Sequence, residues 1–311
     1  MKSLLLAVCI LLILGIAAVY VFIPSHLAVV SVVPMKCNVN SAGRVLGDTA
    51  AWSRWWPSGQ PHYRVVRRLR RGAEVVIDDG DGRAADRRAG DDPVSGVLSV
   101  FPLVRDDSSY LQWQLNLDAG AGPIGRIGRY REARKLKDEM GIILDSLRAY
   151  LEVESHIYGM DISEGTTKDS FLVMTGGKAE MFPNKAMIYG EVGKLKSYLA
   201  GHNGRVTGYP MVNVSPLEGR GYELRVALPT DKLFPEVGGE VYGRRLIKGK
   251  YLEADIRGGD SSVSSALHRM NEYIADHQRT VMAIPFQSLV TDRSKEGDTS
   301  RWVTRLYYPI Y

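Results

Sequence analysis

The residues with the clearest capacity for chemistry lie near the C-terminus, in the segment Arg301–Ile310 with the sequence RWVTRLYYPI. In an extended strand alternate side chains share a face, so Arg305 and Tyr307 are expected on one face and Trp302 on the other. A guanidinium group favours carboxylate or phosphate partners. The segment therefore predicts a surface for a small anionic molecule, unless Arg305 pairs with a carboxylate of the chain itself.

Motifs that would carry catalysis are missing from the sequence. It has no C-x-x-C, H-E-x-x-H, G-x-S-x-G or phosphate-loop lysine motif, and its six histidines are scattered. Gly120, Gly122 and Gly125 spell G-x-G-x-x-G, but no parallel β-α-β unit follows them, which favours a connector over a dinucleotide site. We therefore expect no catalytic residues, no metal and no cofactor, and a binding protein is favoured over an enzyme.

The N-terminus carries an uncharged run of twenty residues, Leu4–Ile23. As a helix rising about 1.5 Å per residue, it is about 30 Å long, which matches the hydrocarbon thickness of a bilayer. Cleaved signal peptides usually have a shorter apolar core and small residues at the cut, whereas Tyr20 and Phe22 stand at the end of this run. The run predicts an uncleaved transmembrane anchor, residues 1–24, with a cleaved signal peptide as the alternative.

The orientation of this anchor depends on few charges. Lys2 precedes the run, and after it no Lys or Arg occurs until Lys36. The positive-inside tendency then predicts a cytoplasmic N-terminus, with the soluble domains in the periplasm or outside the cell. Cys9 lies within the run and Cys37 is alone in the soluble part, so cysteine usage does not decide the compartment.

The net charge of +5 is modest for a chain of 311 residues. Its densest part, the arginines between Arg64 and Arg71, is followed at once by Glu74 and by aspartates from Asp78 onward. Neighbouring opposite charges cancel at a distance. The sequence therefore predicts a solvated strand pair in this region and no binding of nucleic acid.

A first soluble domain, residues 25–158, combines strand patterns with one long amphipathic helix. The predicted strands are Leu27–Val33, His62–Val66, Glu74–Asp78, Gly96–Leu103 and Tyr110–Leu117. Between Arg131 and Leu151 apolar residues recur at three- and four-residue steps. An antiparallel sheet packed against one long helix predicts an α+β domain.

The order of these elements, with AWSRWWP at Ala51–Pro57, resembles the START-like polyketide cyclase/dehydrase superfamily (SRPBCC, the helix-grip fold), which often has W-x-x-W-x-P at this place. The resemblance implies an apolar cavity between helix and sheet, with Trp52 and Trp55 at its mouth. The alternative is that these two tryptophans fill the core at one end of the domain.

A second soluble domain, residues 160–311, contains an internal repeat with a constant offset of 75 positions. KSYLAGHN at Lys196–Asn203 aligns with NEYIADHQ at Asn271–Gln278, and a proline-containing strand follows each copy. Each copy predicts a strand, a helix and two further strands, so the domain is expected to be α+β with a pseudo-twofold arrangement. The interface of two such units is a natural place for a ligand groove.

This second domain resembles the GyrI-like family of effector-binding domains. The matching segments are GKYLEADIRGG at Gly249–Gly259, IPFQSLVTD at Ile284–Asp292, and the C-terminal RWVTRLYYPI. The resemblance implies a ligand groove, for which the candidate residues are Trp302, Arg305, Tyr307 and Tyr251. Arg305 departs from the family, which usually has a glutamate facing the groove at this position, and this departure disfavours cationic ligands.

Together these features predict a membrane-anchored protein that senses or sequesters a small hydrophobic or anionic ligand. No DNA-binding segment is recognised, so a signalling role would need a protein partner. One alternative is a cyclase-, dehydrase- or hydrolase-like enzyme that uses one of the two cavities. Another is a structural or sequestering protein of the cell envelope.

Overall fold

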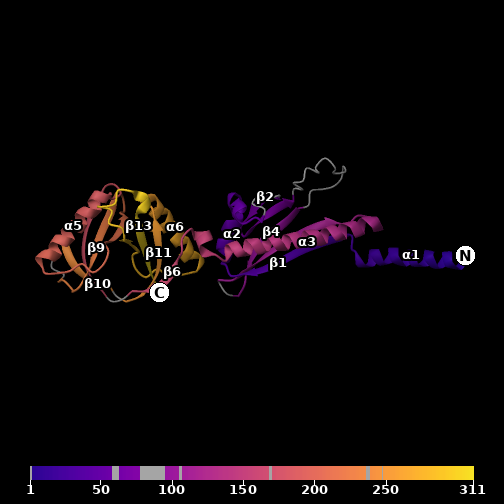
Figure 1. Cartoon of the computed structure of the whole chain (residues 1–311), viewed down its shortest axis with the longest axis horizontal. Helices are drawn as coiled ribbons and strands as arrows, with labels where there is room; N and C mark the ends of the chain where they lie inside the picture. The colour runs from indigo at the N-terminus through magenta and orange to yellow at the C-terminus, as the bar shows by residue number, and fades with distance from the viewer. Residues whose placement is uncertain are drawn as a thin grey trace. The chain divides into compact units, whose positions relative to one another are not determined.

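The structure, a computed structural model, describes residues 2–57, 63–77, 95–104, 107–167, 170–235, 239–246 and 248–311. Contacts divide the chain into two compact units, Met1–Val153 and Glu154–Tyr311. Both units are α+β with antiparallel sheets, and one apolar helix stands at the N-terminus, as predicted (Figure 1). The aspartates that follow Glu74, from Asp78 to Asp92, lie outside the described residues.

The N-terminal helix α1 (Lys2–Phe22) is long and apolar enough to cross a membrane over Leu4–Phe22, a property that signal sequences share. Its end is fixed to the start of α3 (Pro123–Leu151). The Tyr20 hydroxyl donates to the carbonyl of Ala121 at 2.7 Å, and Arg126 Nη1 donates to the carbonyl of Ile23 at 2.9 Å. The Arg126 guanidinium also lies 4.4 Å from the centre of the Tyr20 ring.

Five antiparallel strands form the sheet of the first unit. In spatial order they are β1 (His26–Met35), β5 (Ser109–Asp118), β4 (Ser95–Pro102), β3 (Gly72–Ile77) and β2 (Tyr63–Leu69). The short helices α2 (Val39–Gly47) and η1 (Thr49–Arg54) follow β1 in the chain. Because β5 pairs antiparallel with both β1 and β4, the glycines before α3 form a connector and no dinucleotide-binding unit.

Helix α3 lies along β1 (Figure 1) and begins eight residues before the predicted start, at Pro123. Proline is favoured at the first position of a helix, where its missing N–H is not needed. The buried residues of α3 are Ala133, Met140, Ile143, Leu144, Leu147 and Leu151. Packing against the sheet therefore holds the second half of the helix far more than the first.

The second unit has one sheet of eight strands. Their spatial order is β10 (Val241–Leu246), β7 (Ser170–Ala179), β9 (Tyr222–Thr230), β8 (Met211–Pro216), β12 (Phe286–Leu289), β13 (Val303–Ile310), β11 (Lys250–Arg257) and β6 (Ser163–Thr166). The remaining elements are α4 (Glu154–Tyr158), α5 (Lys185–Gly201), α6 (Asp260–Asp276) and η3 (Thr299–Arg301). Each repeat copy forms a strand, a helix and two strands in the expected order. Figure 1 shows α5 beside β9 and α6 beside β11.

The repeat extends to the atomic detail of the two helix ends. The rings of Tyr198 and His202 stack at 4.1 Å, and those of Tyr273 and His277 stack at the same distance. In both pairs the histidine Nδ1 lies close to the tyrosine carbonyl, at 2.8 Å and 2.9 Å. The next residues, Asn203 and Gln278, have positive φ angles of 52° and 50°. Periodicity of apolar residues alone would not produce this match.

The left-handed backbone at Gln278 predicts a stabilising substitution. This conformation costs most residues about 1–2 kcal/mol but costs glycine nothing. Gln278→Gly should therefore raise the free energy of unfolding by about 0.5–1 kcal/mol in urea titrations of the full chain. Gln287→Gly, in the extended strand β12, is the control and should lower it. Equal losses in the two variants would contradict the assigned helix end.

Candidate functional site

The central strands β8 and β12 join the two repeat copies. Val212 pairs with Gln287, its own counterpart 75 positions later in the chain. Gln287 in turn pairs with Leu306, so these three residues lie on the same face of the sheet. Val212 belongs to the core beneath α5, and Leu306 to the core beneath α6. Both helices therefore cover one face, and we call the opposite face the open face.

Arg305 lies on the open face and is paired with a carboxylate of the chain. It stands opposite Asp255 in the pairing of β13 with β11. Its Nε lies 2.5 Å from Asp255 Oδ1, and its Nη2 lies 2.8 Å from Oδ2. Both side chains remain open to solvent, at 38% and 49% exposure. The hydrogen bond from Arg305 lowers the pKa of Asp255, and the same bond raises the pKa of Arg305.

Three aromatic rings, which we call the aromatic strip, lie next to this ion pair. Phe286 stacks on Tyr307 at 4.8 Å, and Tyr307 meets Tyr251 at 5.0 Å. The ring of Tyr251 lies across Gly165, where an added Cβ would be 2.7 Å from it. Burial, followed by the charge of Glu253, raises the pKa of Tyr251. The strip is thus held in place from the side of β6.

Glu253 is the acidic group closest in register to the aromatic strip. It stands directly opposite Tyr307 in the pairing of β11 with β13. The Ser163 hydroxyl lies 3.4 Å from its Oε1, and the described residues provide it with no ion pair. Arg305 is already neutralised by Asp255, so Glu253 is the uncompensated charge at the strip.

The equivalent positions in the other repeat copy have different side chains. Asn213 lies 75 positions before Ser288 and is its counterpart in the repeat. Arg225 pairs with Asn213, and Arg305 pairs with Ser288. Arg225 is therefore the counterpart of Arg305, at an offset of 80. Arg225 pairs with Glu223 at 2.8 Å. By the same registers, the counterparts of Tyr251, Glu253, Phe286 and Tyr307 are Leu172, Met174, Met211 and Ala227. One half of the open face is therefore aromatic and acidic where the other is aliphatic.

Trp302 does not join this group. Strand β13 alternates as predicted, with Thr304 and Leu306 fully buried and with Arg305 and Tyr307 partly exposed. Trp302 itself is 7% exposed, and its Nε1 donates to the carbonyl of Glu296 at 3.1 Å. The structure thus brings Tyr251, Arg305 and Tyr307 together and places Trp302 at the base of the preceding loop.

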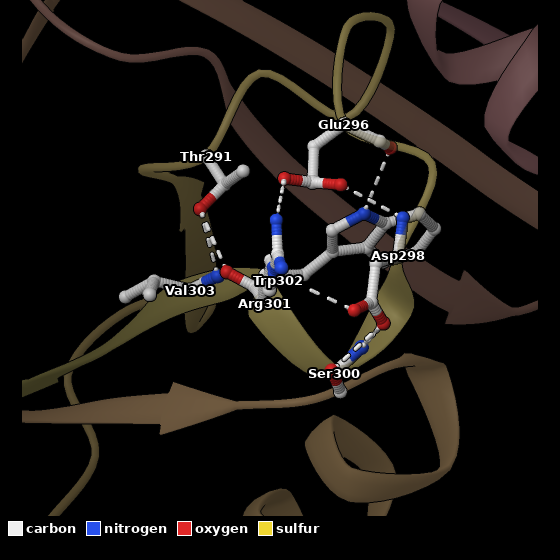
Figure 2. A network of polar contacts seen from close by, with 7 residues as sticks. All are labelled: Thr291, Glu296, Asp298, Ser300, Arg301, Trp302 and Val303. Carbon is white, nitrogen blue, oxygen red and sulfur yellow. Dashed lines mark hydrogen bonds and ion pairs between the residues drawn. The ribbon is translucent and has the colours of Figure 1, made fainter.

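A network of polar contacts shapes that loop (Figure 2). Asp298 accepts bonds from the Ser300 backbone at 3.0 Å and from its hydroxyl at 2.7 Å, which lowers the pKa of Asp298. Arg301 lies 3.5 Å from Asp298 and 3.9 Å from Glu296, and Thr291 accepts a bond from the Val303 backbone at 2.9 Å. These contacts fix the position at which β13 begins.

Arg293 is a buried cation that the sequence reading did not identify. Its side chain is 5% exposed and lies 3.1 Å from Asp260, at the start of α6. It also donates to the Thr304 hydroxyl at 2.6 Å and stacks on Trp302 at 4.6 Å. This residue connects the loop to α6, and no local pattern distinguishes it from a solvated arginine.

Trp52 and Trp55, the candidates in the first unit, are each 2% exposed. Their rings are 5.1 Å apart, and Trp52 Nε1 donates to the carbonyl of Leu46 at 3.2 Å. This is the position expected of the packing alternative, and a role in ligand binding stays a prediction. A separate hollow of about 650 Å³ lies between β1 and α3. Its lining residues are Leu27, Ala28, Val29, Val30, Tyr130, Ala133, Arg134, Lys137 and Asp138.

Comparison with known proteins adds distant structural similarities. No family model matches the chain, and no curated protein matches it. The C-terminal domain of EcmrR is 10% identical with a TM-score of 0.40, over 49% of this chain and 98% of that one. A hydrolase from Listeria innocua is 9% identical with a TM-score of 0.38, over 49% and 92%. SAV2435 bound to tetraphenylphosphonium is 14% identical with a TM-score of 0.32, over 49% and 94%. Scores of this size do not by themselves assign a fold or a function.

The ion pair predicts a specific titration. Because the pKa of Asp255 is lowered in the folded chain, the pair stabilises the fold above the unfolded value of about 3.9 and loses this effect as the pH falls through the folded pKa. The effect on stability is small because both groups are solvated. In Arg305→Gln, carboxyl NMR should show the pKa of Asp255 rising towards its ordinary value. Arg225→Gln is the matched control and should leave it unchanged.

Proposed function

We propose that the chain is a membrane-anchored small-molecule-binding protein whose second unit is a GyrI-like ligand domain. The observation that carries this proposal is the aromatic strip beside two charged groups on the open face. Aromatic rings provide a large apolar contact, and a few fixed polar groups orient a ligand. Tyr251, Tyr307 and Arg305 are the sequence-predicted residues in this site, and Phe286 and Glu253 complete it.

The charge balance supports a hydrophobic ligand with a cationic or hydrogen-bond-donating group. Asp255 already satisfies Arg305, so the attraction of this arginine for an added anion is reduced. Within the described residues Glu253 has a hydrogen bond from the Ser163 hydroxyl and no ion pair, and aromatic faces also attract cations. The anionic ligand inferred from Arg305 alone is the alternative. It requires the ligand to displace Asp255.

For the first unit, we propose a START-like helix-grip domain. The order of β1, two short helices, four strands and the long helix α3 supports this proposal. The lining of the hollow between β1 and α3 combines apolar residues of β1 with the charged residues Arg134, Lys137 and Asp138 of α3. It is a second candidate place for an amphipathic molecule.

Two ions of matched size test the ligand site. Tetraphenylphosphonium and tetraphenylborate have similar shapes and opposite charges. Calorimetry on the full chain should show the phosphonium binding about tenfold more tightly, because Glu253 attracts it and cation–π contacts add to this attraction. Glu253→Gln should remove the difference, and Tyr307→Leu should weaken both ions.

Glu223→Gln, in the other half of the open face, is the control and should change neither affinity. A preference for tetraphenylborate that Arg305→Gln abolishes would establish the anionic alternative. Failure of both ions to bind, or affinities that are the same in Tyr307→Leu, would remove the aromatic strip as the site.

The anchor is tested separately by mass and by extraction. If α1 is an uncleaved span, the intact mass of the protein isolated from membranes should include residues 2–23, and alkaline carbonate should not release it. Alkaline carbonate releases proteins that charged surface contacts hold on a membrane. A twenty-residue apolar helix is held by its burial in the hydrocarbon and therefore stays. A mature chain that begins after Phe22 would identify a signal peptide instead.

A further inference from the structure

Helix α3 has its positive charge concentrated at one end. Residues 123–137 hold six basic side chains and one acidic side chain, a net charge of +5. The basic residues are Arg126, Arg129, Arg131, Arg134, Lys135 and Lys137. Residues 138–151 hold three acidic side chains and one basic side chain, a net charge of −2. We call residues 123–137 the basic half of α3.

Helix stability does not explain this distribution. The N-terminal end of a helix favours acidic side chains, because its unpaired N–H groups give it a partial positive charge. The first turn of α3 contains no acidic residue, and its cap, Gly122, provides no side-chain bond. Arg129 pairs with Glu132 at 2.9 Å. Within the described residues, the exposed groups of Arg131, Arg134 and Lys135 have no recorded ion pair. The basic half is therefore arranged for an external anionic partner.

The contacts with α1 define where this partner lies. Arg126 donates to the carbonyls of Ile23 and of Gly120, so the start of α3 is held at the end of the apolar stretch. The helix rises about 14 Å from Arg126 to Lys135. Lys135 therefore lies at most about this far from the membrane side of α3, for any orientation of the helix axis. The headgroup layer of a bilayer is about 6 Å thick, and charges act over a further 8–10 Å at physiological salt. The exposed arginines of the basic half thus lie within electrostatic reach of the headgroups.

An exposed apolar residue at the same end agrees with this placement. Ile124, in the first turn of α3, is 85% exposed. A single isoleucine in water needs no explanation, but beside an apolar anchor and a set of arginines it fits the boundary between headgroups and acyl chains. We propose that the basic half of α3 binds the anionic phospholipid headgroups of the membrane that α1 crosses. This inference rests on the proposed anchoring.

The other arginine-rich segment lies elsewhere in the first unit. The β2–β3 turn at Arg70 and Arg71 directly precedes Gly72. Gly72 pairs with Ser99 on β4, and the pairing continues through β5 to Val32 on β1. Val32 is six residues beyond His26, or about 20 Å along the strand from the anchor. The turn with Arg70 and Arg71 therefore lies at the far end of the sheet, whereas the basic half of α3 begins beside the anchor.

Lipid selectivity of the reconstituted full chain tests the proposal. The chain is placed in phosphatidylcholine vesicles, and electron paramagnetic resonance compares the association of spin-labelled phosphatidylglycerol and phosphatidylcholine. Each basic group near a membrane surface contributes about 1 kcal/mol, so we expect a preference for phosphatidylglycerol on the order of fivefold or more. The preference should fall towards one in Arg131→Gln/Arg134→Gln/Lys135→Gln, and in 1 M salt.

A matched variant with the same loss of charge in the second unit, Lys178→Gln/Arg205→Gln/Arg220→Gln, should keep the preference. Flotation of the vesicles, measured in parallel, separates the two claims. A chain that floats with the vesicles but shows no lipid preference, or keeps its preference in the α3 variant, would overturn the inference and leave the anchor intact. A chain that does not float would remove both.

Discussion

The second unit depends on the antiparallel pairing of β8 with β12. This short contact joins two repeat copies into one sheet, and the pairing of Val212 with its own counterpart Gln287 fixes their relative register. A shift by one residue would turn the apolar face of one copy away from its helix. With this register, α5 and α6 both cover one face, and among the described residues no helix covers the other. Asn213 Nδ2, which donates to the carbonyl of Pro285 at 2.8 Å, adds a side-chain bond across the same join.

The symmetry of the backbone makes the asymmetry of the open face informative. Both copies keep an arginine at the equivalent strand position, paired with a carboxylate in each case. Around Arg305 the neighbours are aromatic or acidic, whereas at the corresponding positions of the other copy they are aliphatic. Leu172 and Ala227 are buried, whereas their counterparts Tyr251 and Tyr307 remain partly exposed, so the aromatic and acidic half is the part of the open face that a ligand can reach. Such a surface suits a largely hydrophobic molecule.

Local patterns in the sequence predicted more of the elements than of their partners. The alternation in β13 and the 75-residue repeat are visible in a single segment or a pair of segments, and both correspond to the structure. The pairing of Arg305 with Asp255 depends on the register between strands fifty residues apart, which no local pattern determines. Phe286 and Glu253 belong to the site because each pairs with Tyr307 across neighbouring strands. Both lie in segments that match the GyrI-like family, but the sequence did not show that they meet Tyr307. Arg293 was missed because its burial arises from the loop and from α6 together.

Helix α3 shows how one continuous element can meet two different constraints. Its second half has the spacing of a core helix, and Met140, Leu144 and Leu147 are buried completely. Its first half buries less, so tertiary packing contributes less to its helical form. The bonds of Arg126 to the end of α1, together with proline at the first position, add to the stability of that half. The basic half of α3 is bonded to the end of the apolar helix α1. Its positive charge is best explained by an anionic partner at that end of the first unit. Were α3 only a core helix, its apolar spacing would be expected to begin near Pro123 and not near Ala133.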